Sequence, residues 1–164
     1  MKSHIRNLSV ITLLAGAGVM AFVTLRADQP RHIDRIIMHC SAVAPDQTSS
    51  ARQIDEWHRA KGWKMIGYHY VIRRDGSIEL GRPADMIGAH TNGQNSYSLG
   101  ICYEGGLNET GKAADTRTPE QKATLLALLK HLKTLYPNAT IHGHNEFARK
   151  ACPCFDAHAE YSQL

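Results

Sequence analysis

One stretch near the C-terminus, residues 142–156, concentrates side chains that bind metals and handle protons. Within fifteen positions it holds imidazoles, carboxylates, thiols and an ammonium group. Histidine and cysteine are the usual ligands of zinc, and a catalytic zinc site has three protein ligands and one open position. This stretch can supply two of the three ligands, so we expect a third from elsewhere in the chain.

His39 is the best candidate for that third ligand. It follows residues 33–38, an apolar and β-branched run that predicts a buried strand ending at His39. His144 is favoured within the C-terminal stretch because Cys152 follows it after eight positions, with a proline behind the cysteine. His142 is a rival of His144, since residues two apart on a strand face the same way.

The other histidines carry weaker signals. A lone histidine is more often structural than a ligand, and four of them have no metal-binding neighbours in the sequence: His4, His58, His131 and His158. His69 and His90 are placed where they could also reach a pocket. Spacing alone therefore leaves the ligand set open, with His39, His144 and Cys152 as the leading combination.

Strands and a hairpin are predicted between these histidines. Residues 68–72 are expected to form a strand, and Asp75-Gly76 predicts a tight turn because this dipeptide accepts positive φ. Residues 77–80 should return antiparallel. The segment 81–96 is rich in Gly, Asn and Pro and is expected to be a long surface loop that carries His90. Residues 98–104 predict a central strand.

Two helices have clear start signals. Residues 51–60 follow Ser49 and Ser50, either of which can cap a helix, and Gly62 should end it. The second helix begins at Thr118-Pro119-Glu120-Gln121, where threonine caps, proline takes the first helical position and glutamine completes a capping box. A short strand over residues 140–142 then leads to His144.

Length and composition indicate one globular domain. The chain has 164 residues, of which 43% are hydrophobic and 21% charged, which argues against disorder. The net charge of +4 favours anionic surfaces such as cell-wall polymers, phospholipid or nucleic acid, without selecting one. Four cysteines do not form the dense framework of a small disulfide-stapled domain.

The N-terminal region reads as a separate unit. Residues 8–25 contain no charge, and Lys2 and Arg6 precede them. As a helix of about 27 Å, this segment is just under the ~30 Å of a bilayer core. The sequence therefore predicts an N-terminal hydrophobic helix in a unit of residues 1–27, a linker at 28–32 and a folded domain at 33–164.

Two interpretations of the hydrophobic helix remain. A cleaved signal peptide needs small residues at −3 and −1 of the cleavage site, and the sequence before residue 28 offers Leu25 at −3. An uncleaved signal anchor fits better. Lys2 and Arg6 should stay in the cytoplasm, which places the rest of the chain in the periplasm, with residues 8–25 in the inner membrane.

A set of short motifs resembles one enzyme family, the zinc-dependent N-acetylmuramoyl-L-alanine amidases, and most closely the amidase-type phage lysozymes. The family also includes bacterial amidases and animal peptidoglycan recognition proteins. Seven motifs occur in order and cover most of the chain after the linker: residues 37–42, 67–72, 74–76, 88–90, 98–102, 118–121, and 144–146 together with 150–153.

The resemblance implies a single α/β domain with a mixed central β-sheet flanked by helices. It implies Zn²⁺ held by His39, His144 and Cys152, with Tyr68 and Lys150 assisting catalysis. The substrate would be peptidoglycan, cut at the amide between N-acetylmuramic acid and L-alanine of the stem peptide. It also implies that two further cysteines are not metal ligands: Cys40 and Cys102.

The implied chemistry is consistent with these residue types. Zinc lowers the pKa of a bound water to roughly 7, which provides a hydroxide at neutral pH. Tyr68 or Lys150 can stabilise the oxyanion or pass a proton to the leaving amine, and the sequence does not assign these roles. Glu146 is expected to be structural rather than a general base. His90 is expected to contact the substrate.

Other functions fit the sequence less well. A zinc deaminase needs His-x-Glu followed at a distance by Pro-Cys-x-x-Cys, and Cys152-Pro153-Cys154 is one residue short and too close to Glu146. A non-catalytic peptidoglycan-binding protein is the stronger alternative, but Cys152 is present. A regulator of a cytoplasmic polymerase is disfavoured by the membrane segment. We therefore expect a monomeric phage or prophage endolysin with no nucleic-acid partner.

Overall fold

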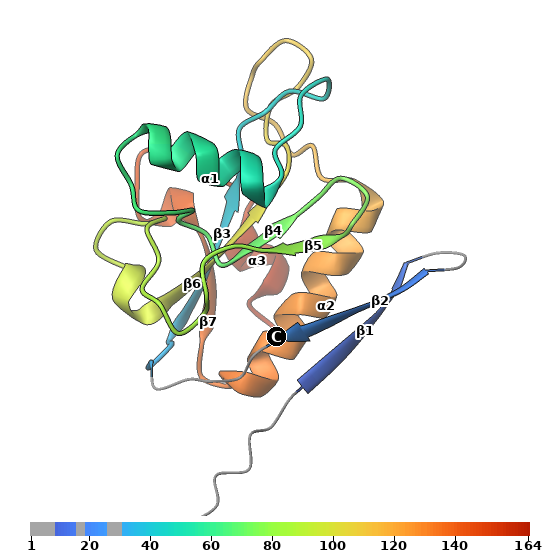
Figure 1. Cartoon of the computed structure of the whole chain (residues 1–164), viewed down its shortest axis with the longest axis vertical. Helices are drawn as coiled ribbons and strands as arrows, with labels where there is room; N and C mark the ends of the chain where they lie inside the picture. Colours follow the sequence, from blue (N-terminus) through green and yellow to red (C-terminus); the bar gives the residue numbers. More distant parts are fainter. Residues whose placement is uncertain (1–8, 16–18, 26–30) are drawn as a thin grey trace, which may run out of the picture.

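The computed structural model describes residues 9–15, 19–25 and 31–164 of the chain. Residues 31–164 contain five strands and three α-helices (Figure 1). The strands are β3 (Arg35–Cys40), β4 (Tyr70–Ile72), β5 (Ile78–Leu80), β6 (Ser98–Tyr103) and β7 (Thr140–Gly143). The helices are α1 (Ala51–Ala60), α2 (Pro119–Leu135) and α3 (Ala157–Tyr161), with short 3-10 turns η1 (Asn95–Tyr97) and η2 (His144–Glu146).

The five strands form one mixed sheet in the order β5-β4-β6-β3-β7. β3 runs parallel to both of its neighbours, β6 and β7, and β4 is parallel to β6. Only β5 is antiparallel, as the hairpin partner of β4. The predicted α/β fold with a mixed central sheet flanked by helices is confirmed, and the carboxyl ends of β3, β6 and β7 lie at one edge of the sheet.

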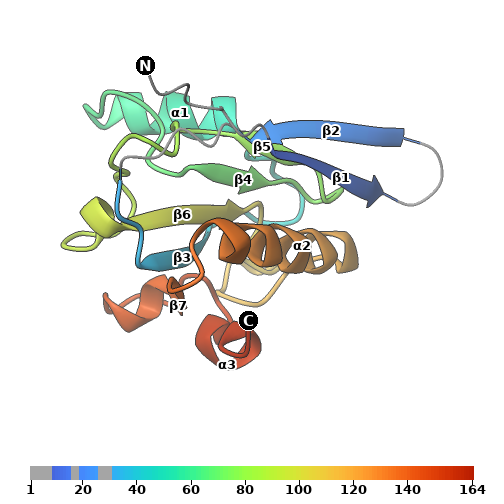
Figure 2. The same ribbon diagram turned by 90° about the horizontal axis from the view of Figure 1, so that it is seen from below.

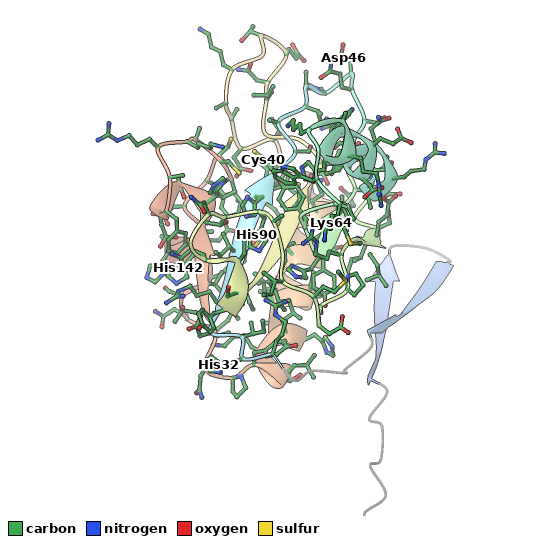
Figure 3. All side chains as sticks on the ribbon, turned by 60° about the vertical axis from the view of Figure 1, so that its left-hand side comes forward. His32, Cys40, Asp46, Lys64, His90 and His142 are labelled. Atoms are coloured by element: carbon green, nitrogen blue, oxygen red, sulfur yellow. The ribbon has the colours of Figure 1, made fainter. Side chains whose placement is uncertain are left out.

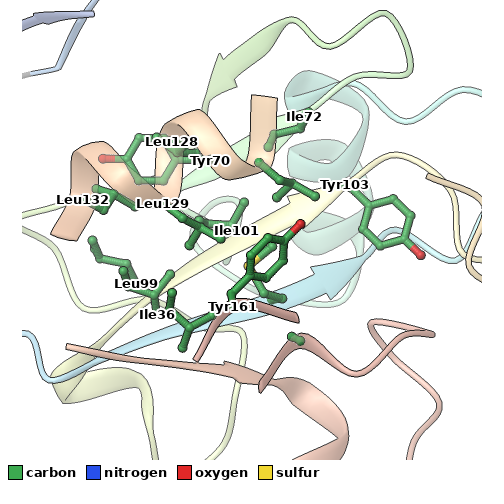
Figure 4. Packing of buried hydrophobic residues seen from close by; sticks show 14 of the residues in the cluster. Ile36, Tyr70, Ile72, Leu99, Ile101, Tyr103, Leu128, Leu129, Leu132 and Tyr161 are labelled. Carbon is green, nitrogen blue, oxygen red and sulfur yellow. The ribbon is translucent and has the colours of Figure 1, made fainter. Parts of the chain in front are cut away.

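Side chains alternate between the two faces of this sheet. On one face, residues of β3 and β6 such as Ile36, Leu99 and Ile101 pack against the leucines of α2 and against Tyr161 of α3 (Figure 4). On the other face, Val71 and Cys102 pack against Ile54 of α1. The sheet therefore lies between α1 and the pair α2 and α3 (Figure 2).

Local signals in the sequence set the helix and turn boundaries. Ser50 accepts a hydrogen bond from the backbone N–H of Gln53 at the start of α1, and Gly62 adopts φ +85° just beyond its end. Thr118 and Gln121 form a complete capping box at the start of α2. In the hairpin between β4 and β5, Gly76 has φ +82°. These four predictions are confirmed.

The N-terminal segment differs from its expected conformation. Ser9–Ala15 (β1) pairs with Val19–Leu25 (β2) as antiparallel strands, so the single hydrophobic helix predicted there is not what the structure shows. An apolar run of this kind does not distinguish helix from strand by periodicity, and Val, Ile, Phe and Thr favour strands in water. No helix in the part of the chain that the structure describes is long and apolar enough to span a bilayer.

The sequence did not predict α3 or the contacts of Arg31. α3 begins at Asp156, whose carboxylate accepts from the backbone N–H of Ala159, and it packs beside β7. Arg31, which falls in the predicted linker, donates from its guanidinium to the carbonyls of Ala84, Asn95 and Ser98. Arg31 therefore fastens the start of the domain to the long loop before β6.

Candidate metal centre

His39, His144 and Cys152 lie together at the carboxyl edge of the sheet. Their ligand atoms are all within 4.8 Å of one another, and the rings of His39 and His144 have centroids 4.6 Å apart. The Sγ of Cys152 is 3.7 Å from Nδ1 of His39. The three residues that the sequence favoured as zinc ligands are thus brought together by the fold.

Strand pairing explains the meeting of the two histidines. β3 and β7 are parallel, and Met38 is the register partner of Gly143. The next residues along the two strands are His39 and His144, so they emerge side by side where β7 ends. Met38 points into the core beneath α2, and His39 therefore faces the opposite side of the sheet.

Contacts on either side of the Cys152 loop fix its position. The hydroxyl of Tyr103 donates to the carbonyl of Pro153 at 2.7 Å, and the backbone N–H of Cys40 donates to Sγ of Cys152 at 3.3 Å. Beyond the loop, the guanidinium of Arg117 lies 3.3 Å from the ring centroid of Phe155. The contacts of Cys40 and Tyr103 attach the Cys152 loop to the ends of β3 and β6.

His39 is oriented by groups on the side of its ring that faces away from Cys152. Its Nε2 lies 3.2 Å from Oγ1 of Thr91 and 3.1 Å from Nδ1 of His90. The backbone N–H groups of His90 and Thr91 both donate to Oδ1 of Asn95 at 2.9 Å, which holds this part of the loop in place. Nε2 is therefore occupied by protein neighbours, and Nδ1 is the nitrogen that faces Cys152.

The electrostatic setting keeps the two imidazoles neutral. Burial lowers the pKa of His39 well below its usual range, and His90, His144 and Lys150 lower it further. The pKa of His144 is lowered by burial and then by Lys150. A neutral imidazole is the form that binds a metal. Two such imidazoles and one thiol, gathered around one point, are a donor set that fits a zinc ion.

Tyr68 and Lys150 both lie near this cluster. The ring centroid of Tyr68 is 5.0 Å from that of His39. Burial raises the pKa of the Tyr68 phenol well above its usual range, followed by the effects of nearby thiols, so the hydroxyl keeps its proton. Lys150 is exposed, and its charge reaches both His39 and His144.

His90 contacts His39 of the cluster and lies near the centre of the side of the molecule that Figure 3 shows. Only 9% of its surface is exposed. A Cβ added to Gly100 of β6 would come within 2.6 Å of the His90 ring, so the absence of a side chain there makes room for the imidazole. The structure thus places His90 against His39, and its predicted contact with substrate stays a prediction.

The remaining cysteines occupy distinct surroundings. Cys40 is buried, and its pKa is raised first by a hydrogen bond with Cys152 and then by burial. The Sγ of Cys154 lies 3.7 Å from Sγ of Cys40, and burial together with Cys40 raises the pKa of Cys154 to about 12. Cys102 is fully buried beside α1. All four cysteines are free thiols.

Other polar residues singled out in the sequence serve the scaffold. The Glu146 carboxylate accepts from the backbone N–H of Gly143 at 2.6 Å and contacts Nδ1 of His142 at 2.7 Å. His69 accepts from the N–H of Gly100 through Nδ1 and contacts the carbonyl of Met86 through Nε2. His58 accepts from the N–H of Gly67. These contacts agree with structural roles for Glu146 and His58.

Thr91 is the neighbour of the cluster that the sequence reasoning missed. Its hydroxyl lies between His39 and His90, and only 2% of its surface is exposed. A threonine in a loop carries no spacing signal for such a role. Its position directly after His90 was the one available indication.

Comparisons with known proteins agree with this geometry. The family profile described as N-acetylmuramoyl-L-alanine amidase matches residues 29–155. The endolysin of Escherichia phage T7 is 42% identical over 128 residues, which cover 78% of this chain and 85% of that protein. The endolysin of Klebsiella phage KP32 is 43% identical over 122 residues, covering 74% of this chain and 81% of its own.

Solved structures show the same fold. The N-acetylmuramoyl-L-alanine amidase LysC from Clostridium intestinale aligns with a TM-score of 0.69 and 32% identity, over 81% of this chain and 84% of its own. Drosophila PGRP-LB aligns with a TM-score of 0.65 and 27% identity, over 83% of each chain. The profile covers well over half of the sequence, including His39, His144 and Cys152. The chain therefore belongs to the N-acetylmuramoyl-L-alanine amidase family.

Proposed function

We propose that this protein is a zinc-dependent peptidoglycan amidase that cleaves the bond between the lactyl group of N-acetylmuramic acid and L-alanine of the stem peptide. Membership of the amidase family makes it a peptidoglycan hydrolase. The observation that carries the zinc chemistry is the cluster of His39, His144 and Cys152, whose ligand atoms lie within 4.8 Å of one another. The similarity of the chain to phage endolysins supports the proposal that it is the endolysin of a phage or prophage.

Zinc would be held by Nδ1 of His39, one ring nitrogen of His144 and Sγ of Cys152. A zinc ion with three protein ligands and an open position activates water and polarises a carbonyl. Thr91 and His90 hold Nε2 of His39, so the ring of this ligand is already oriented before a metal arrives.

Tyr68 and Lys150 act on the charge that develops during hydrolysis. The attacked carbonyl oxygen becomes negative, and a neutral phenol beside the cluster can donate a hydrogen bond to it. Lys150 is exposed, and its positive charge acts on both His39 and His144. The departing amine needs a proton, and we propose that one of these two residues relays it.

The activity is tested on purified peptidoglycan. The full protein should release stem peptides with a free N-terminal L-alanine, a chelator should stop the release, and added Zn²⁺ should restore it. Cys152→Ala should release none. A protein that binds the polymer but releases no peptide at saturating zinc would be a binding protein and would contradict the proposal.

The ligand set is tested separately by bound zinc. His39→Ala, His144→Ala and Cys152→Ala should each reduce zinc retained at the catalytic cluster after dialysis. His32→Ala, a surface histidine outside the cluster, is the matched control. Unchanged occupancy of this cluster in Cys152→Ala would defeat the assignment and point to His142 or Cys154.

We also propose that the chain is exported and acts as a monomer in the periplasm, held at the inner membrane by residues 8–25. The support is the uncharged run of eighteen residues that follows Lys2 and Arg6. The structure pairs Ser9–Ala15 with Val19–Leu25 as strands, but a bilayer core requires every backbone group to be satisfied within one segment, which favours a helix there. A cleaved export signal is the alternative.

A further inference from the structure

A second group of metal-binding side chains lies beside the catalytic cluster. His142 of β7, Glu146 of η2 and His158 of α3 offer ligand atoms that all lie within 4.8 Å of one another. His142 is partly buried, and the other two residues are exposed. Figure 3 shows His142 on the β7 side of the molecule, away from His90. None of the three takes part in the hydrolysis proposed above.

Each of these side chains is held through its other polar atom. Nε2 of His142 lies 2.8 Å from Oγ1 of Thr140, and Oε1 of Glu146 accepts from the N–H of Gly143 at 2.6 Å. Nδ1 of His158 lies 3.3 Å from the carbonyl of Ile141, which accepts its hydrogen. The remaining polar atoms are Nδ1 of His142, Oε2 of Glu146 and Nε2 of His158, and these would be the ligand atoms.

This pattern is the one that supports metal ligands in proteins. A ligating histidine usually donates its second ring N–H to a carbonyl, carboxylate or hydroxyl, which fixes the tautomer and the direction of the ring. An ordinary His–Glu pair would account for the 2.7 Å contact between His142 and Glu146. It does not account for a second imidazole, His158, stacked on His142 with centroids 5.8 Å apart and planes 21° apart.

We propose that His142, Glu146 and His158 form a second metal site, separate from the catalytic cluster, for a divalent first-row ion such as Zn²⁺. Two imidazoles and one carboxylate are a donor set that suits zinc, nickel or copper. Bonds of roughly 2.0–2.2 Å to such an ion place the ligand atoms about 3.3 Å apart. The ligand atoms now lie within 4.8 Å of one another, and rotations of the two exposed side chains, Glu146 and His158, would bring them to that spacing.

An ion at this site would connect three elements. It would join α3 to β7 and to η2, the turn that begins with His144. An ion that binds the folded chain and not the unfolded one stabilises the fold. Occupancy would therefore strengthen the segment that presents one catalytic ligand, without adding a group to the reaction.

Zinc stoichiometry of the full protein tests the site. After equilibration with Zn²⁺, the wild-type chain should bind two ions, and His158→Ala and Cys152→Ala should each bind one. The double variant should bind none, and His32→Ala should bind two. One ion in the wild type that is unaffected by His158→Ala, or two ions retained in His158→Ala, would overturn the proposal.

The Cys152→Ala background separates this proposal from the catalytic one. If His39, His144 and Cys152 were not the catalytic ligands, this variant would still show whether His158 controls the binding of one ion. Thermal unfolding of the Cys152→Ala variant supplies an independent readout. Zn²⁺ should raise the melting temperature of Cys152→Ala, and the rise should disappear when His158→Gln is added. A rise that persists in His158→Gln would contradict the site.

Two further measurements distinguish loss of the metal site from misfolding of a variant. Thr140→Val keeps all three ligands and removes only the hydroxyl that holds His142, so the second ion should bind about 10- to 100-fold more weakly. In a Co²⁺ titration, the thiolate-to-metal band should saturate at one equivalent while a second equivalent adds no thiolate band. Unchanged affinity in Thr140→Val, or saturation of all metal-dependent absorbance at one equivalent, would argue against a second site.

Discussion

The two ring nitrogens of His39 have different neighbours, and this difference leaves Nδ1 as the nitrogen that could bind a metal. Nδ1 faces Cys152, whereas Nε2 faces the hydroxyl of Thr91 and the ring of His90. A ligand whose second nitrogen is already held loses little conformational freedom when a metal binds. The quality of the site therefore depends on residues that do not touch the ion.

Thr91→Val tests this dependence, because valine keeps the shape of threonine and removes only its hydroxyl. We expect zinc affinity to fall about 10- to 100-fold while the fold is retained. Competition with a chromogenic chelator measures the change. Thr134→Val removes an exposed hydroxyl on α2 and should leave zinc binding unchanged. Equal affinities for the two variants would show that Thr91 does not orient His39.

Tyr68 and Lys150 make a second prediction at this scale. Tyr68→Phe and Lys150→Ala should keep their zinc and lose turnover by about 10²- to 10³-fold, since the lost groups act on charge that appears only in the transition state. Peptide release from peptidoglycan and bound zinc are measured on the same samples. Tyr97→Phe and Lys61→Ala, both on exposed residues, serve as controls. Near-normal turnover in both test variants would mean that the metal cluster works without them.

Single residues were predictable where their spacing carried information. His39, His144 and Cys152 stood out because each follows a predicted strand or a metal-binding neighbour in the sequence. The resemblance to amidases then singled out Tyr68. The support from Thr91 was not predictable, because the loop between β5 and β6 brings it to His39 from 52 positions away.

At the scale of elements, a buried carboxylate joins the hairpin to the end of β6. Glu104 is 2% exposed, and it accepts hydrogen bonds from Nε of Arg73 at 2.9 Å and from the backbone N–H of Ser49 at 2.7 Å. Burial alone would raise its pKa, but these hydrogen bonds and that from the N–H of Arg74 outweigh burial and lower the pKa. The carboxylate thus ties β4, β6 and the segment before α1 together.

This network predicts a pH dependence of stability. The folded pKa of Glu104 lies below its unfolded value near 4.5, so its contribution is present above that value and is lost as the pH falls through the folded pKa. Glu104→Gln should reduce the free energy of unfolding at pH 7 by about 1.5–3 kcal/mol. Because Arg73 also pairs with Glu79, part of the network should survive.

Urea denaturation at several pH values measures this effect. Glu104→Gln should flatten the loss of stability between pH 5 and the acid limit, whereas Glu109→Gln, an exposed control, should follow the wild type. A Glu104→Gln variant as stable as the wild type at pH 7 would show that the buried carboxylate adds nothing to the fold.

Elements with strong local signals were predicted and those that depend on the environment were not. The capping box of Thr118 and Gln121, the cap of α1 and the turn at Gly76 act within a few residues, so the sequence reveals them. α3 has five residues and owes its place to packing on β7. The N-terminal run satisfies its backbone either as a helix in lipid or as paired strands, and composition alone does not choose between them.

For the whole molecule, the proposal that residues 8–25 anchor the chain in the inner membrane makes a testable prediction. Residues 8–25 include eight small residues, which contribute little transfer free energy and should hold a spanning helix weakly: Ser9, Thr12, Ala15, Gly16, Ala17, Gly18, Ala21 and Thr24. We expect the full chain to fractionate with the inner membrane and to move to the soluble fraction when the membrane is depolarised.

Fractionation of expressing cells and N-terminal sequencing test this expectation. A released protein that begins at Met1 or Lys2 supports an uncleaved anchor. A control chain with the small residues of this segment replaced by leucine should stay in the membrane after depolarisation. A mature protein that begins near Asp28 and is soluble from the outset would exclude the anchor and leave periplasmic export alone.

The parallel pairing of β3 with β7 has a consequence for the timing of synthesis. Cys152 lies 113 positions after His39, and β7 is laid down beside β3 only after β6 and α2 have been made. A ribosome that has translated three quarters of the chain has produced one ligand and no binding site. A chain that stops before residue 144 carries only His39 of the three residues, so incomplete chains of that length cannot assemble the cluster and should have no amidase activity.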